Sequence, residues 1–142
     1  MRTILHSDLN NFYASVECLK NPALWSVPMA VCGDPQARHG IILSKNELAK
    51  AAGVKTAEAI WQAKEKCPEL VLVGTDFPAY LRYAEKMRRI YADFSDRVEP
   101  FGLDEAWLDV SDVGAEGKVI ADEIRARAKK ELGLTVSVGV SF

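Results

Sequence analysis

Residues 101–108 read Phe-Gly-Leu-Asp-Glu-Ala-Trp-Leu, so that two adjacent carboxylates, Asp104 and Glu105, interrupt an apolar stretch typical of a strand. The strand-like opening segment, residues 3–8, also ends on a carboxylate, Asp8. An ionised carboxylate that leaves water costs free energy unless a cation or several hydrogen-bond donors meet it. Three such groups from distant parts of the chain therefore suggest one divalent-metal site, provided that the fold brings them together.

The pattern of elements around these carboxylates predicts an α+β fold. Two long amphipathic helices are expected, one capped by Asp76 and one over residues 115–132. The apolar, core-facing side of the first is expected to consist of Phe77, Leu81, Ala84, Met87, Tyr91 and Phe94. Strands are expected at residues 3–8, 98–101, 105–110 and 135–141. With residues 11–75 set aside, the order is strand, helix, strand, strand, helix, strand. This is the split βαβ, ferredoxin-like order, in which both helices cover one face of an antiparallel sheet.

That topology makes the first and third strands antiparallel neighbours, so it predicts that Asp8 lies beside Asp104. The place of Glu105 is harder to predict, because consecutive side chains of a strand point to opposite faces of the sheet. Asp104 and Glu105 can reach one cation only if the backbone bends, and Gly102 is well placed to permit a bend. Geometry alone therefore supports the pairing of Asp8 with Asp104 more firmly than the role of Glu105.

The segment set aside is predicted to be a small α/β unit. Asn10 is expected to cap a helix that runs to about Leu19 and has Glu17 on its outer side. A hairpin is expected from two strands joined by the turn-rich residues 34–40. Its strands lie at residues 28–33 and 41–44, helices follow at 46–52 and 58–66, and a further strand lies at 70–73.

The chemistry that the carboxylates suggest depends on their oxygen ligands. Hard oxygens without His or Cys ligands suit Mg²⁺ rather than zinc, and we expect His6 to be structural. Carboxylates that grip two such ions about 4 Å apart serve in-line phosphoryl transfer. Solvent-facing acids at sheet edges are an equally good interpretation of these residues taken by themselves.

Composition excludes several classes of protein. The chain has 142 residues and a formal charge of −2, which is not the basic footprint of a whole nucleic-acid-binding protein. Its three cysteines form no C-x-x-C pair, so neither a disulfide framework nor a zinc site is expected. No apolar run approaches the roughly 20 residues needed to cross a bilayer. We therefore expect a cytoplasmic protein without a membrane partner, and the strand-like C-terminus suggests a fragment of a longer chain.

Four segments, taken together and in order, resemble the Y-family translesion DNA polymerases of the DinB/UmuC type. Residues 7–17 and 102–109 are similar to the family's two metal-binding motifs. Residues 46–55 resemble its fingers segment, and residues 137–141 resemble the strand before its next motif. The combination covers essentially the whole chain and is far more specific than any one segment.

The resemblance implies a palm of residues 1–10 and 77–142, with a fingers subdomain of residues 11–76 inserted and the thumb and little finger absent from this chain. Asp8 and Asp104 would bridge two Mg²⁺ ions, with Mn²⁺ as a possible substitute. Glu105 would hold the ion that activates the primer 3′-hydroxyl, and Leu9 would lend a backbone carbonyl to the nucleotide-bound ion.

The resemblance also implies a nucleotide site. Backbone amides around Asn11, Phe12 and Tyr13, at a helix N-terminus, would receive the triphosphate. Tyr13 would be the steric gate that excludes a ribose 2′-hydroxyl, and the alternative is a half-buried core tyrosine. The Phe12 side chain is expected to pack in the core. The sequence departs from the family where a tyrosine and an arginine often bind the triphosphate, because these positions hold Glu47 and Lys50. Lys50 keeps the positive charge of the arginine but lacks its planar guanidinium, which can form two parallel hydrogen bonds to a phosphate. Glu47 is a negatively charged residue where the triphosphate should approach.

The function implied is template-directed DNA synthesis in error-prone, SOS-type DNA repair, by a nucleotidyltransferase that uses primer–template DNA and deoxynucleoside triphosphates. The isolated fragment would be weak or inactive, and a sliding clamp would bind through the missing C-terminal parts. One alternative is a non-catalytic family member that acts as a scaffold in a lesion-bypass complex. Another is a different palm-fold nucleotidyltransferase, such as a nucleotide cyclase.

Overall fold

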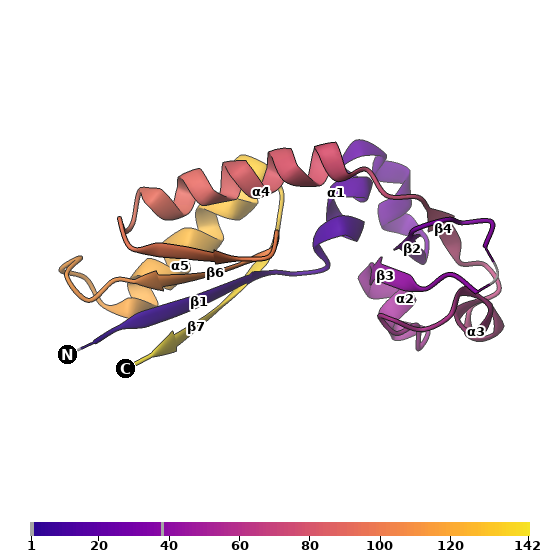
Figure 1. The fold of residues 1–142 in the computed structure, drawn as a ribbon, viewed down its shortest axis with the longest axis horizontal. Coiled ribbons are helices and arrows are strands. Elements are labelled where there is room, and N and C mark those ends of the chain that lie inside the picture. The colour runs from indigo at the N-terminus through magenta and orange to yellow at the C-terminus, as the bar shows by residue number, and fades with distance from the viewer. Residues whose placement is uncertain (1, 38) are drawn as a thin grey trace. The chain divides into compact units, whose positions relative to one another are not determined.

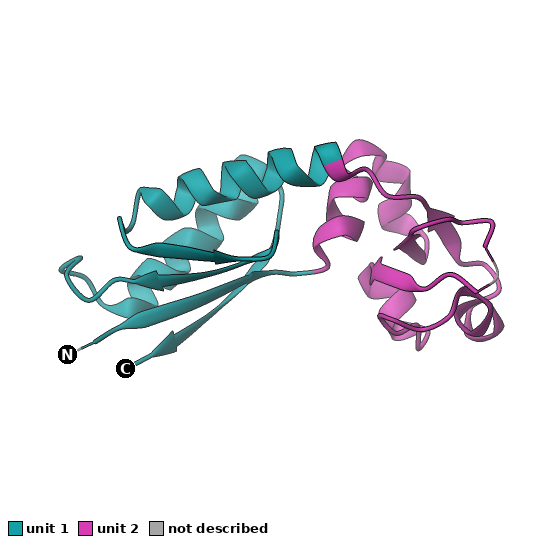
Figure 2. Ribbon diagram, in the orientation of Figure 1, with its two compact units in different colours: residues 1–10, 78–142 teal, residues 11–77 magenta. Residues whose placement is uncertain are grey.

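The computed structural model describes residues 2–37 and 39–142, so Met1 and the Arg38 part of the predicted turn lie outside the described residues. The chain divides into two compact units, shown in two colours in Figure 2. Unit 1 comprises residues 1–10 and 78–142, and unit 2 comprises residues 11–77.

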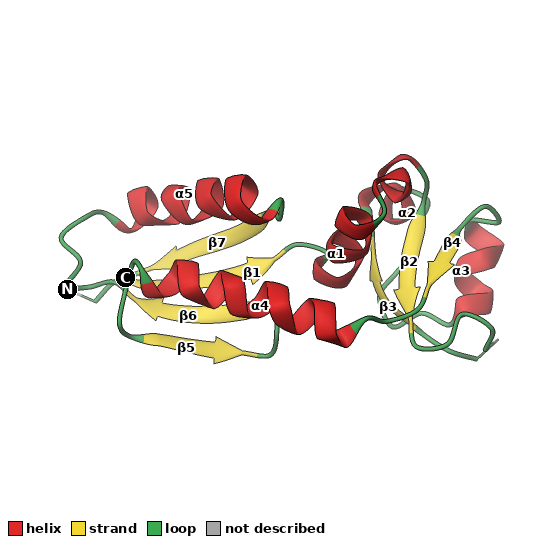
Figure 3. Ribbon diagram, turned by 90° about the horizontal axis from the view of Figure 1, so that it is seen from above, coloured by secondary structure: helices red, strands yellow, loops and turns green. Residues whose placement is uncertain are grey.

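Unit 1, which carries the labels β1, β6, β7, α4 and α5 in Figure 1, is built on a four-stranded antiparallel sheet with the strand order β5-β6-β1-β7 (Figure 3). Its strands are β1 (Ile4–Leu9), β5 (Val98–Phe101), β6 (Glu105–Asp109) and β7 (Val136–Ser141). Its helices are α4 (Phe77–Ala92) and α5 (Gly117–Arg127), and α5 continues into a π-helical turn at Ala128–Leu132. This order confirms the predicted ferredoxin-like fold, with the first and third strands as central neighbours.

One face of this sheet is buried. Leu5, Ser7 and Leu9 of β1 are buried, while the alternate residues of the strand are only partly so. Helix α5 approaches this face closely, because a Cβ atom on Gly117 would lie 2.7 Å from the Val140 side chain of β7. Helix α4 also lies along the sheet (Figure 3). The opposite face of the sheet therefore carries Asp8 and the other alternate residues.

The buried face of α4 differs in part from the predicted one. Ala84, Met87 and Tyr91 are buried as predicted, but Phe77 and Leu81 are 44% and 54% exposed. The buried stripe begins at Tyr80, because residues 80, 84, 87 and 91 share one side of a helix with 3.6 residues per turn.

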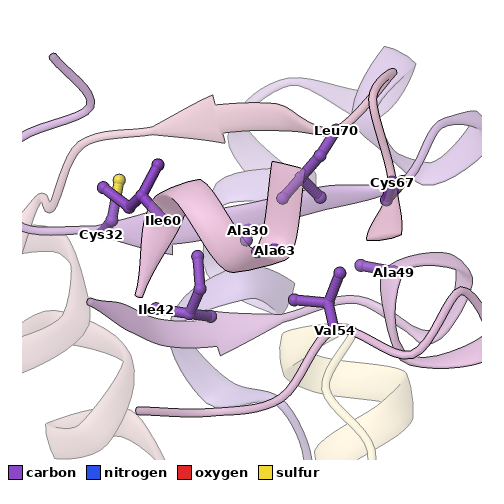
Figure 4. Packing of buried hydrophobic residues seen from close by; sticks show 9 residues of the cluster. All are labelled: Ala30, Cys32, Ile42, Ala49, Val54, Ile60, Ala63, Cys67 and Leu70. Carbon is purple, nitrogen blue, oxygen red and sulfur yellow. The ribbon is translucent and has the colours of Figure 1, made fainter. Parts of the chain in front are cut away.

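Unit 2 has a three-stranded sheet of order β3-β2-β4, in which β2 and β3 form the predicted antiparallel hairpin and β2 and β4 are parallel. Its strands are β2 (Met29–Cys32), β3 (Ile42–Lys45) and β4 (Val71–Val73). Its helices are α1 (Phe12–Lys20), a 3₁₀ helix at Pro22–Ser26, α2 (Glu47–Ala51) and α3 (Ile60–Lys66). One hydrophobic cluster, drawn in Figure 4, lies between this sheet and α2 and α3, and consists of Ala30, Cys32, Ile42, Ala49, Val54, Ile60, Ala63, Cys67 and Leu70.

Two predictions for α1 are wrong. The residue that precedes the helix is Asn11, not Asn10, and its backbone is left-handed with φ 47°. Asparagine tolerates this conformation better than most residues do. Glu17 is 4% exposed rather than on the outer side, because the Lys20 ammonium lies 2.9 Å from its carboxylate and supplies the opposite charge that a buried acid needs.

Within the described part of the chain, the helices are all too short or too polar to span a membrane.

Candidate active site

The sheet of unit 1 sets Asp8 directly opposite Glu105, whereas Asp104, the predicted neighbour of Asp8, lies one position further along, opposite Leu9. Asp8 and Glu105 are Cα partners in the antiparallel pairing of β1 with β6. Just beyond this pair, the Leu9 amide donates a 2.8 Å hydrogen bond to the carbonyl oxygen of Asp104. Asp8 and Glu105 alternate with the buried residues of their strands, so both lie on the face opposite α5. The two carboxylate-bearing segments, residues 3–8 and 101–108, therefore lie side by side where β1 ends and β6 begins.

Asp104 escapes the alternation rule because it lies in a turn and not in a strand. Strand β5 ends at Phe101 and β6 begins at Glu105, and the residues between them form a tight hairpin loop. Gly102 has φ 66° in this loop, the left-handed conformation that glycine adopts without steric cost. The backbone reverses here, which removes the geometric objection to Asp104 and Glu105 serving one site.

The charges of these three residues interact. The pKa of Asp104 is raised above its usual value, first by burial and then by the negative charge of Asp8. The pKa of Asp8 is raised by burial and by Glu105, with a partial offset from His6. A divalent cation would relieve both the lost hydration and the repulsion, and carboxylate oxygens are the donors that Mg²⁺ prefers. The donor set therefore fits a hard divalent cation.

The expectation that no histidine lies near the carboxylates is wrong. His6 is the Cα partner of Trp107, its ring lies 4.4 Å from the Trp107 ring, and its Nε2 atom lies 3.3 Å from a Glu105 carboxylate oxygen. Over the described ranges, no three His, Cys, Asp or Glu side chains converge as metal ligands. The Glu105 side chain must therefore turn from His6 before it can share a cation with Asp8 and Asp104.

A buried hydrogen bond supports β1 directly beneath this site. The hydroxyl groups of Ser7 and Tyr91 lie 2.7 Å apart, both away from water. The pKa of Tyr91 is raised to about 12, first by burial and also by the negative charges of Asp8 and Asp104, while the hydrogen bond with Ser7 opposes this rise. Tyr91 thus ties α4 to the strand that carries Asp8. The sequence predicted Tyr91 as a core residue, but nothing in its spacing indicated this partner.

We expect Ser7→Ala and Tyr91→Phe each to lower the free energy of unfolding by about 1–3 kcal/mol, because each leaves one buried hydroxyl without its partner. The double variant should lose less than the sum of the two, since no orphaned hydroxyl remains. Urea unfolding followed by circular dichroism measures all four proteins. Simple additivity would show that the two hydroxyls do not interact.

The predicted nucleotide residues lie in unit 2. Phe12 is buried at the start of α1, as its expected packing role requires. Tyr13 is partly buried and packs on a hydrophobic cluster that includes Ala14 and Met29. Its ring meets that of Phe77 edge-on at a centroid distance of 5.6 Å. Tyr13 is therefore held by neighbours on more than one side.

Glu47 does not point away from the start of α1. The Asn11 side-chain amide donates a 2.8 Å hydrogen bond to a Glu47 carboxylate oxygen. Lys50 lies in the last turn of α2 and is exposed. The acid, rather than the lysine, is thus in contact with the residue that precedes α1.

Asn46 is a supporting residue that sequence reasoning did not single out. It is 5% exposed, and its side-chain oxygen accepts hydrogen bonds from the amides of Ala49 and Met29. Its side-chain NH₂ group donates to the carbonyls of Leu24 and Val27. Asn46 therefore fixes the start of α2, and an asparagine directly before Glu-Leu is a helix N-cap signal that could have identified it.

Comparison with known proteins gives consistent results. Residues 7–142 match the model of the impB/mucB/samB family. The chain is 56% identical to DNA polymerase IV of Acetivibrio thermocellus in an alignment of 144 positions that covers 99% of this chain and 36% of that protein. It is 45% identical to DNA polymerase IV of Protochlamydia amoebophila, again over 99% of this chain and 41% of that protein. The chain thus spans well under half the length of these relatives.

Solved structures agree. A Y-family DNA polymerase chimera of Dbh and Dpo4 superposes with a TM-score of 0.91 at 27% identity, over 97% of this chain and 42% of that one. The insertion ternary complex of Dbh DNA polymerase gives a TM-score of 0.90 at 27% identity, over 98% and 42% of the two chains. These matches confirm the resemblance to Y-family DNA polymerases, and the chain belongs to the impB/mucB/samB family.

Proposed function

We propose that this chain is the catalytic palm-and-fingers part of a translesion DNA polymerase, a nucleotidyltransferase that extends a primer along a template during DNA repair. The palm would be residues 1–10 and 77–142, and the fingers residues 11–76. The observation that carries the proposal is that the backbones of Asp8, Asp104 and Glu105 lie side by side where the central strand β1 ends and its neighbour β6 begins. The relatives named DNA polymerase IV support it.

In this proposal the carboxylates serve phosphoryl transfer. Asp8, Asp104 and Glu105 would hold Mg²⁺ through their carboxylate oxygens, and the Leu9 backbone carbonyl would be a further oxygen ligand. Bound Mg²⁺ supplies Lewis-acid stabilisation of the attacking and leaving oxygens. The protein's own part is to bring the backbone at Asp8, Asp104 and Glu105 together, through the pairing of β1 with β6 and the turn at Gly102, so that the three side chains can turn toward one cation. Manganese, a similar hard cation, would substitute.

The fingers residues would receive the incoming nucleotide. Backbone amides of Asn11, Phe12 and Tyr13 begin α1, where the helix dipole favours a phosphate. Lys50 would add a positive charge. A solved neighbour described as an insertion ternary complex of a DNA polymerase supports DNA and a nucleotide as ligands.

A primer-extension assay on the full-length protein that carries this chain tests the proposal. We expect deoxynucleotides to be added opposite a template when Mg²⁺ is present, and no addition when it is chelated. This chain alone should extend primers poorly, because it spans well under half the length of its DNA polymerase IV relatives. Absence of extension by the full-length protein would favour the non-catalytic scaffold. We also propose that the full-length protein binds a sliding clamp through its C-terminal parts. Its proposed location is the cytoplasm.

The Glu47 carboxylate should weaken nucleotide binding. Its hydrogen bond from Asn11 keeps a negative charge near the amides that would receive the triphosphate. Two charges in water about 4 Å apart interact by about 1 kcal/mol, so we expect Glu47→Gln to lower the KM for deoxynucleotides about fivefold with kcat unchanged. Glu65→Gln, which removes an exposed acid from α3, is the matched control. An equal KM in both variants would mean that Glu47 does not act on the nucleotide.

A further inference from the structure

Phe77 is a large apolar residue that is 44% exposed yet held in a defined contact. Its ring meets Tyr13 edge-on, with centroids 5.6 Å apart and planes at 78°. The Phe12 ring also lies near Tyr13, at a centroid distance of 5.7 Å. An edge-to-face pair at this separation is attractive beyond the area it buries. The Tyr13 ring therefore has an aromatic contact from a segment 64 residues further along the chain.

The segment that carries Phe77 is tied to the same helix as Tyr13. The Lys20 ammonium, in the last turn of α1, lies 2.8 Å from the Asp76 carboxylate and 2.9 Å from that of Glu17. Hydrogen bonds to these two acids raise the pKa of Lys20, so its positive charge persists. Glu17 is buried, so the Lys20 ammonium is held between an immobile carboxylate and that of Asp76.

The periodicity of α1 explains why these contacts occur together. Tyr13, Glu17 and Lys20 are four and three residues apart, so they lie on one face of the helix. Asp76 and Phe77 both contact that face: Asp76 forms an ion pair with Lys20, and the Phe77 ring contacts the Tyr13 ring. A charged contact thus anchors the segment at one end of the helix, and an aromatic contact holds Tyr13 near the other.

We propose that Phe77 is a positioning residue for sugar selection, which keeps the Tyr13 ring from swinging aside. This inference rests on the proposed function, in which Tyr13 is the steric gate. A gate excludes a hydroxyl group only as firmly as its own ring resists displacement. An edge-to-face contact corresponds to a factor of roughly threefold to tenfold in an equilibrium between held and displaced rings. Loss of the contact lowers sugar discrimination by that factor.

The test compares incorporation of deoxynucleotides and ribonucleotides by the full-length protein, as kcat/KM for each. Phe77→Leu keeps an apolar residue but removes the ring, and it should raise relative ribonucleotide use threefold to tenfold while kcat for deoxynucleotides is unchanged. Phe77→Tyr keeps the aromatic ring and should retain the wild-type preference for deoxynucleotides over ribonucleotides. Asp76→Asn, which weakens the anchor at Lys20, should shift selectivity in the same direction. Trp61→Leu, at a 37% exposed aromatic residue of α3, is the matched control.

A double variant makes the test specific to Tyr13. If Phe77 acts through that ring, Tyr13→Ala with Phe77→Leu should discriminate no worse than Tyr13→Ala alone. Independent, multiplying effects would overturn the inference, as would unchanged selectivity in Phe77→Leu or an equal loss with both sugars. These outcomes differ from a failure of the proposed function. In that case the wild type would add no deoxynucleotides, or Tyr13→Ala would admit no ribonucleotides, and both proposals would fall together.

Discussion

Asp8→Asn and Asp104→Asn should each lower the rate of primer extension by the full-length protein about 10³-fold. The substitutions keep the size of the side chain but remove the charge that would bind Mg²⁺ and, through it, the developing charge of the reaction. The pKa values of both acids are raised by burial and by neighbouring carboxylates, and a bound cation would offset both effects. Single-turnover extension measures the effect on the chemical step.

Cation binding gives a second measurement for these variants that does not depend on activity. Titration with Mn²⁺, followed by electron paramagnetic resonance, should show weaker binding in Asp8→Asn and Asp104→Asn. Glu99→Gln removes an exposed acid from the neighbouring strand β5 and is the matched control for both measurements. Wild-type extension by either aspartate variant would refute the metal assignment.

Tyr13→Ala should let the full-length protein add ribonucleotides, with a loss of sugar discrimination of roughly 10²-fold or more. The ring would exclude a ribose 2′-hydroxyl by steric collision, and removing the ring would leave enough space for that hydroxyl group. The ring is partly buried against the hydrophobic cluster of unit 2 and contacts Phe77, so it is a rigid obstacle. The ratio of kcat/KM for the two sugars measures the change.

Tyr13→Phe is the conservative control for this prediction, because it keeps the ring and loses only the hydroxyl group. Discrimination should stay within a few-fold of the wild type. If Tyr13→Phe admits ribonucleotides as readily as Tyr13→Ala does, hydrogen bonding by the hydroxyl group, rather than collision, selects the sugar. Unchanged discrimination in both variants would remove Tyr13 from the role.

Much of the fold was predictable from local pattern. The strand at residues 98–101 and the order of elements in unit 1 follow from periodicity and turn residues. The meeting of Asp8 with the Asp104 turn follows from the strand order that this implies. The helices were less well predicted, since the apolar residues of α4 allow two overlapping stripes and only packing against the sheet selects the one that includes Tyr80. Glu17 was misplaced because its partner Lys20 makes burial of the acid acceptable.

The sequence by itself determined the family, the topology and the carboxylates that mark the site. Only the tertiary structure decided that Asp104 lies in a turn, that Glu105 contacts His6 and that Glu47 accepts a hydrogen bond from Asn11. The same holds for the contact between Phe77 and Tyr13. The physical reason is one of range. Periodicity and turn chemistry act over a few neighbouring residues and are visible in a sequence, whereas these contacts join distant segments and depend on register, backbone reversal and side-chain rotamers that only packing selects.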